Sequence, residues 1–163
     1  MSYSTIEAAI ETLVRAYSGG TVFTAALGNV DRGDYRTKDA AGTSVACTIV
    51  QVEPSDYAYT APGGRGTHGA RMARHVIGLD LYVKRGQALG GDGIAYAAIL
   101  TLRDGLIAHM ERYPLLNGTA GVKLARTISA TRPIMLVNRN HVFSRITMEA
   151  IEQFALDWVE TPG

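Results

Sequence analysis

Residues His75–Lys84 have the sequence HVIGLDLYVK and carry the clearest strand pattern in the chain. From position 77 onward, every second residue is a large apolar one: Ile77, Leu79, Leu81 and Val83. A period of two is typical of a β-strand with one buried face. We predict a strand over residues 72–84, and its apolar side requires other elements to cover it.

A long helix is predicted directly after this strand. The connecting segment Arg85–Gly93 contains four glycines, and Asp92 is a suitable N-cap for a helix over residues 94–113. Ala98 and Gly105 would allow that helix to pack closely on a sheet, and Pro114 ends it. The apolar stripe of the helix comprises Ala95, Ile99, Leu102, Leu106, Met110 and Tyr113.

Upstream of the strand over residues 72–84, the chain predicts another helix and more strand. Ser4 and Glu7 have the spacing of a capping box, and an amphipathic helix follows as far as Gly19-Gly20. Residues 43–53 (TSVACTIVQVE) are rich in β-branched residues, as strands are. Less clear signals suggest a strand over 22–30 and a turn at 31–34.

Residues 54–71 (PSDYAYTAPGGRGTHGAR) predict a long Gly/Tyr-rich loop or arm, since they hold two prolines and four glycines. Downstream, residues 122–137 predict one or two strands that break near Pro133. For residues 141–159, alternation favours a long strand with a bulge, while helical spacing in the second half competes with it.

Together these elements predict an α+β fold: a mostly antiparallel β-sheet packed by an N-terminal helix and one long central helix. The 163 residues suit a single domain over 1–163, and a hydrophobic content of 47% is enough to bury a core. No apolar run is long enough to span a bilayer, and no export signal is expected.

The search for chemistry predicts no catalytic residue, no metal site and no cofactor. The four histidines, His68, His75, His109 and His141, do not have the spacing of a local metal motif. We expect His75 at an edge or on the surface, and His109 near the end of its helix, where it interacts with the helix dipole. Cys47 is expected to be a small buried residue, and the glycines at 86–93 lack the P-loop and dinucleotide fingerprints.

Charge is distributed in blocks along the chain. Residues 1–60 carry a net charge of −3, residues 61–147 carry +8, and residues 148–163 carry −4. Opposite blocks could attract between copies of the chain, or they could mix on one folded surface. The small overall charge of +1 argues against a dedicated nucleic-acid binder.

The order of elements resembles the tail-terminator (tail-completion) proteins of long-tailed bacteriophages. The resemblance lies in the first helix Ser4–Tyr17, the strand His75–Lys84, the glycine loop, the helix Ile94–Tyr113 before Pro114, and the closing strands from Val122 and His141. In that family, a six-membered ring of such subunits caps the tail tube and presents a surface to the head or neck.

The resemblance implies a virion structural protein at the tail–neck junction, made in the host cytoplasm and without catalysis. Its implied partners are further copies of itself in a six-membered ring (a homo-hexamer), the tail tube protein and a neck or head-completion protein. Genomic DNA would pass through the lumen without sequence-specific binding, and no membrane is involved. The residues that we expect at subunit or neighbour contacts are Arg65, Arg71, Arg74, Tyr57 and Tyr59.

Two alternatives remain open at the level of sequence. A related neck or tail-tube protein, such as a head-closure or tube protein, would have a similar composition, and a tube protein would form long filaments. A small α+β enzyme or ligand-binding domain is the other alternative, with a scattered site near His68, Asp80 and the loop Gly86–Gly93.

Overall fold

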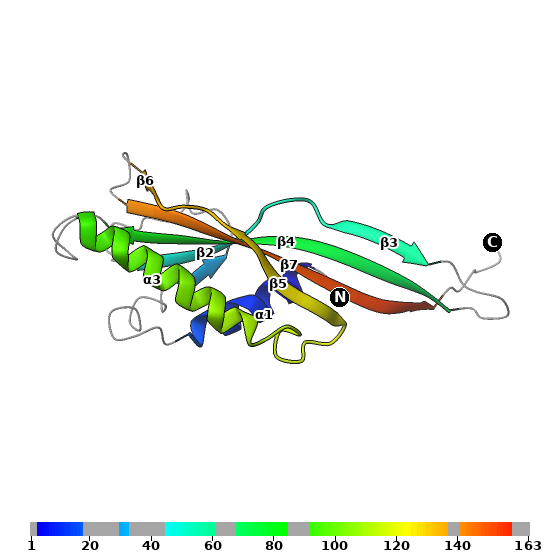
Figure 1. Ribbon diagram of the computed structural model, residues 1–163. Coiled ribbons are helices and arrows are strands. Elements are labelled where there is room, and N and C mark those ends of the chain that lie inside the picture. The colour runs from blue at the N-terminus through cyan, green and yellow to red at the C-terminus, as the bar shows by residue number, and fades with distance from the viewer. Residues whose placement is uncertain are drawn as a thin grey trace.

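The computed structural model describes residues 3–17, 30–32, 45–60, 68–84, 92–136 and 141–157. These residues form an α+β fold in which two helices and a mostly antiparallel sheet are described, which confirms the predicted class (Figure 1). The elements in chain order are α1 (Tyr3–Arg15), β1 (Val30–Arg32), β2 (Val45–Gln51), β3 (Asp56–Thr60), β4 (His68–Lys84), α3 (Asp92–Glu111), β5 (Val122–Ala130), β6 (Ile134–Leu136) and β7 (His141–Asp157).

The sheet is organised around β4 and β7. These two strands are 17 residues each and pair antiparallel along their whole length, from His68 opposite Asp157 to Lys84 opposite His141. The strand order is β1-β2-β4-β7-β5, while β3 pairs with the first part of β4 and β6 with the first part of β7. Among the described pairs only β1 and β2 run parallel.

Both helices cover the same face of this sheet, which we call the front face (Figure 1). From the stripe predicted for the second helix, Ile99, Leu102, Leu106 and Met110 are buried there, and the alternating residues from Ile77 to Val83 lie beneath them. Burial of this apolar surface is the main driving force for the fold. The largest fully buried side chains include Ile6, Ile10, Ile49, Ile77, Leu79, Leu81, Ile99, Leu102, Leu106 and Met110.

The two helices also contact each other through polar atoms. His109 Nε2 donates a hydrogen bond to the carbonyl oxygen of Leu13, in the last turn of α1, over 2.8 Å. His109 therefore satisfies the end of the neighbouring helix rather than acting only on its own dipole. Gly105 faces the hydroxyl of Tyr17, a residue that follows α1 in the chain. The close approach that Gly105 allows is therefore to this tyrosine, and the prediction that it packs against the sheet is wrong.

The back face is the opposite side of the sheet. Tyr82 and Phe143 form a small apolar cluster with Ala46 there. Asp80, also on this face, is only 4% exposed because Arg145 lies directly across from it on β7. The back face is therefore well covered although no described helix packs on it.

Several boundaries differ from the prediction. The segment 54–71 is not one long loop, because Asp56–Thr60 forms β3 and β4 begins at His68; residues 61–67 lie outside the described part. Asp31 and Arg32 belong to β1 rather than to a turn. The last element is a strand, as favoured, but the register shifts lie in β5, between Val122 and Leu124 and between Thr127 and Ser129. Most of the predicted strand 22–30 lies outside the described residues.

Candidate functional site

A three-stranded arm extends beyond the part of the sheet that the helices cover (Figure 1). We define the arm as β3 together with residues 68–74 of β4 and 151–157 of β7. In the register, β3 lies opposite residues 70–74 of β4, and β7 continues on the other side. The arm forms because β4 and β7 are uninterrupted and extend further than the other long strands of the sheet.

Tyrosines occupy the front side of the arm. Tyr57 lies across from Ala73 and Tyr59 across from Arg71, and the two tyrosines are 48% and 59% exposed. The guanidinium of Arg71 stacks over the ring of Tyr57, with its central carbon 5.2 Å from the ring centroid. A cation over an aromatic face is favourable and orders both side chains. This side of the arm therefore presents an aromatic surface next to a positive charge.

An ionic cluster lies on the back face of the sheet, where the arm joins the rest of the sheet. Glu149 accepts a hydrogen bond from Arg74 Nε at 2.7 Å and another from Arg126 Nε at 2.5 Å. These two guanidinium groups hold the pKa of Glu149 below its ordinary value, although partial burial acts in the opposite direction. The side chain of Met72, at 41% exposure, lies in the arm beside this cluster.

The structure separates the residues that we predicted at subunit contacts. Tyr57, Tyr59 and Arg71 share the front side of the arm, whereas Arg74 lies on the back and is bound to Glu149. Arg65 lies outside the described residues. The arm thus joins three of the five predicted residues on one surface and gives Arg74 a structural partner within the chain.

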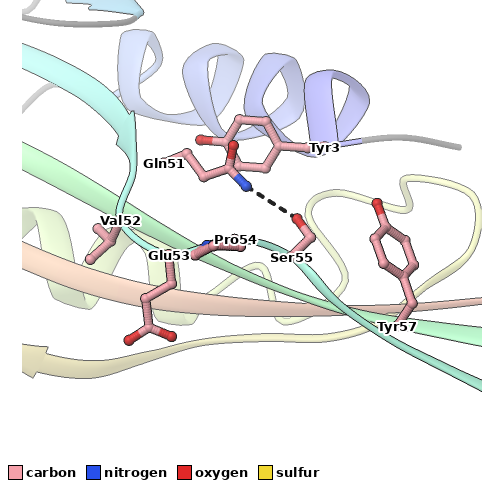
Figure 2. A pocket seen from close by; sticks show the side chains of 7 residues that line it. All are labelled: Tyr3, Gln51, Val52, Glu53, Pro54, Ser55 and Tyr57. Carbon is pink, nitrogen blue, oxygen red and sulfur yellow. Dashed lines mark hydrogen bonds between the residues drawn. The ribbon is translucent and has the colours of Figure 1, made fainter.

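A cleft of about 620 Å³ opens where the arm meets α1. Figure 2 shows Gln51 and Ser55 facing each other below Tyr3, with Tyr57 on the other side of Ser55 and Glu53 pointing away. The connection between β2 and β3 supplies most of the wall. The residues that line the cleft are Tyr3, Gln51, Val52, Glu53, Pro54, Ser55 and Tyr57.

A chain of hydrogen bonds runs from this cleft into the sheet. Ser55 Oγ lies 2.6 Å from His75 Nδ1, and His75 Nε2 lies 2.9 Å from Glu152 Oε1. The side chains of His75 and Glu152 are completely buried. The rings of Tyr3 and Tyr57 meet the imidazole edge-on, with centroids 5.9 and 6.4 Å away.

Sequence reasoning missed this cluster and placed His75 wrongly at an edge or on the surface. β4 is a central strand at His75, which pairs there with β7, and the front face buries the side chain. A signal was available, since position 75 has the same parity as Ile77 and Leu79 in the alternating pattern. The partners Ser55 and Glu152 could not be found that way, because they lie on separate elements far apart in the sequence.

The predicted site of the enzyme alternative is not assembled. His68 and Asp80 belong to the same extended strand, so about 40 Å separates them at roughly 3.3 Å per residue. Asp80 is instead held by Arg145 through two hydrogen bonds of 2.6 and 2.8 Å. The first part of the glycine loop, up to residue 91, lies outside the described residues.

Cys47 is fully buried, as predicted, in the front-face core. Burial and, to a lesser extent, the charge of Asp80 raise the pKa of its thiol to about 12. Within the described ranges no three histidine, cysteine or acidic side chains gather as a metal site would need. The described helices include no segment that is long and apolar enough to cross a membrane.

Comparisons with known proteins add one distant likeness in fold. No protein-family model matches the chain, and no curated protein sequence matches it. Among solved structures, a chain from the "Virion of native gene transfer agent (GTA) particle" is similar, with 15% identity and a TM-score of 0.48. The match covers 94% of this chain and 100% of that chain. A likeness this distant does not carry a functional assignment.

Proposed function

We propose that this chain is a structural protein of a phage-like virion that assembles into a ring, caps the tail tube and joins the tail to the neck. The observation that carries the proposal is the arm, which projects from the helix-covered body and exposes Tyr57, Tyr59 and Met72. Tyr57 and Tyr59 lie together on the front side of the arm, and exposed aromatic side chains grouped on a projecting element are typical of surfaces that bind another protein.

The sheet supports assembly as well. Among the described residues, β3 pairs only with β4 and β5 pairs only with β7, so each of them has an edge that another strand could join. The two edges differ, and a ring needs such a heterologous contact, in which one surface meets a different surface of the next copy. This role requires assembly surfaces and no chemical step.

The resemblance of the element order to tail terminators gives the particular role within the virion. That family has an α+β subunit with an N-terminal helix and a long helix on the sheet, and the fold of this chain has the same parts. The basic segment 61–147 and the acidic ends provide opposite charges that can set the register between neighbours. The tail tube protein and a neck protein are the proposed partners on the two sides of the ring.

The first test is the mass of the purified protein in solution by light scattering, with negative-stain images of the same sample. We expect a discrete ring of about six copies, the number that the resemblance implies, and no filaments. Open-ended tubes would favour the alternative of a tail-tube protein, in which the same heterologous contacts do not close. A monomer at every concentration would contradict a self-assembling ring.

The contribution of the arm is tested with Tyr59→Ser. Tyr59 is exposed and belongs to the arm, whereas Tyr96 is 50% exposed on α3 and provides a matched control, Tyr96→Ser. We expect Tyr59→Ser to shift the population toward monomer and Tyr96→Ser to leave it unchanged. Arg74 is unsuitable for this test, because replacing it with an acid would place two carboxylates together at Glu149.

A further inference from the structure

We propose that Ser55 is an activated nucleophile that reacts with small acyl or aryl esters in the cleft beside Tyr3 and Tyr57. The proposal goes beyond the structural role in a virion, and its reacting group and hydrogen-bond partners are residues that the structural role does not use; Tyr57, a wall of the cleft, is common to both. A nucleophilic serine needs a base within hydrogen-bond reach and a third group that orients the base. Ser55, His75 and Glu152 meet both conditions.

The hydrogen-bond directions follow from the donors that are present. Gln51 Nε2 can only donate, and it reaches Ser55 Oγ at 3.3 Å. Glu152, when ionised, can only accept, so the neutral imidazole directs its Nε2–H to Glu152 Oε1. Nδ1 is then the acceptor for the hydroxyl of Ser55, as a general base requires. The network therefore selects the one tautomer of His75 that can take a proton from Ser55.

The surroundings of the pair favour proton transfer from the hydroxyl. His75 and Glu152 are completely buried, and Glu152 Oε2 has no hydrogen-bond partner among the described residues. Burial disfavours the charged form of each group alone, but an ionised carboxylate 2.9 Å from the ring would stabilise a positive charge on the imidazole. Glu152 is thus a positioning residue that fixes the tautomer and stabilises the imidazolium as it forms.

The position of Ser55 gives the nucleophile access to a substrate. Ser55 lines the cleft of about 620 Å³, while the imidazole lies behind it in the sheet. The rings of Tyr3 and Tyr57 and the side chain of Pro54 give the cleft apolar walls (Figure 2). Such walls suit a short acyl chain or an aryl group, and the amide of Gln51 is the polar donor next to the reacting oxygen.

The reaction has two steps, both of which balance. Ser55 Oγ bonds to the carbonyl carbon of the ester as its proton passes to His75 Nδ1, and Gln51 Nε2 donates to the resulting oxyanion. The bond to the leaving oxygen then breaks, and that oxygen takes the proton from Nδ1 and departs as an alcohol or phenol. Water next attacks the acyl carbon and gives its proton to Nδ1; when the bond to Oγ breaks, Oγ recovers that proton and the acid is released.

The test uses a fluorophosphonate, whose fluoride an activated serine displaces. We expect the full-length protein to gain one phosphonyl group, which peptide mapping by mass spectrometry places on Ser55. Because the mapping is done on the unaltered protein, the result does not depend on a variant that folds. No phosphonylation of Ser55 in folded protein, with a known serine hydrolase labelled in parallel, would overturn the proposal.

Three variants separate an activated serine from a buried structural network. Ser55→Ala should abolish labelling, whereas Ser129→Ala should not change it, because Ser129 is an exposed serine on β5. Glu152→Gln preserves size but removes the charge, and we expect it to slow labelling by about 10²-fold, the scale of general-base catalysis. The rate of p-nitrophenyl acetate hydrolysis should be lost in Ser55→Ala, reduced in Glu152→Gln and unchanged in Ser129→Ala.

A purely structural network gives a different pattern. In that case Glu152→Gln lowers the thermal midpoint but leaves the labelling rate of the folded protein unchanged, which contradicts the proposal. Labelling that persists in Ser55→Ala, on a tyrosine for example, contradicts it as well. Light scattering on the same samples keeps the two proposals apart, since Ser55→Ala should leave the oligomeric state as it is in the unaltered protein.

Discussion

The front and back faces belong to the same strands, yet different forces hold them. On β4, Leu79 points to the front and is fully buried among apolar side chains, while its neighbour Asp80 points to the back and binds Arg145. Hydrophobic burial is non-directional, so the front face fixes how tightly the layers pack. The ion pair between Asp80 and Arg145 joins residues directly opposite on β4 and β7 and depends on their position, so the back face helps to fix which residues pair.

The largest effect should come from a cavity in the front face. Leu79→Ala removes a fully buried side chain, and such changes cost about 2–5 kcal/mol in the free energy of unfolding. Urea denaturation followed by circular dichroism measures the loss. Ile128→Ala is the matched control, because Ile128 is 42% exposed on β5 and should change stability by no more than about 0.5 kcal/mol. Equal losses in the two variants would contradict the assignment of the core.

The ionic cluster on the back face should contribute less and should depend on pH. Glu149→Gln is expected to cost about 1–2 kcal/mol at neutral pH, because it weakens two charged hydrogen bonds whose arginines are partly exposed. The folded pKa of Glu149 is lowered from 4.5, so its contribution is present above that value and is lost as the pH falls through the folded pKa.

The variant should therefore show a smaller loss of stability between pH 5 and acid than the unaltered protein. Glu111→Gln is the control, since Glu111 is exposed at the end of α3. Added salt should also reduce the difference between Glu149→Gln and the unaltered protein, because the arginines are reached by solvent. An acid profile that is identical with and without Glu149 would show that the back face does not depend on this charge.

A polar contact inside the front layer should have an effect near 1 kcal/mol. His109→Phe keeps an aromatic ring between Tyr17 and Tyr113 but leaves the carbonyl of Leu13 without its donor. The expected loss of about 1 kcal/mol is that of one hydrogen bond. Amide hydrogen exchange in the last turn of α1 should become faster. Unchanged exchange there would mean that apolar packing alone holds the two helices together.

The smallest effect on stability is expected in the arm. Tyr59→Ser changes a side chain that is 59% exposed, so the free energy of unfolding should move by no more than about 0.5 kcal/mol. Thermal unfolding at a concentration where the protein is monomeric measures it. A large loss would mean that Tyr59 is part of the folded core and would remove the reason for treating the arm as an assembly surface.

The predictable parts of the fold were those with a repeating pattern. The period of two in His75–Lys84 and the helical stripe around Leu102 each have one buried side, and both elements formed as predicted. The segment 54–71 was mistaken for a loop because its prolines and glycines outweighed the short alternation Tyr57-Ala58-Tyr59. β3 forms because it pairs with β4, and local composition does not show which segments will pair.

The candidate sites were less predictable than the fold. The contact residues expected from the sequence include Tyr57, Tyr59 and Arg71, which the strands bring together. The alternation in this strand indicates that Arg74, three residues after Arg71, faces the other way, but the sequence gives no sign that it binds Glu149. Such contacts depend on the register between strands that are far apart in the chain. A change of one residue in that register would separate the two side chains.

The uninterrupted pairing of β4 with β7 restricts how the length of the arm can change. Because side chains alternate, one extra residue in a strand would turn every later side chain to the opposite face. An insertion inside both strands that keeps each face of the arm, without a bulge such as those in β5, would therefore add two residues to each strand, a step of about 6.6 Å. If the arm contacts a neighbouring subunit, the distance between the two subunits that it can span changes in steps of fixed length.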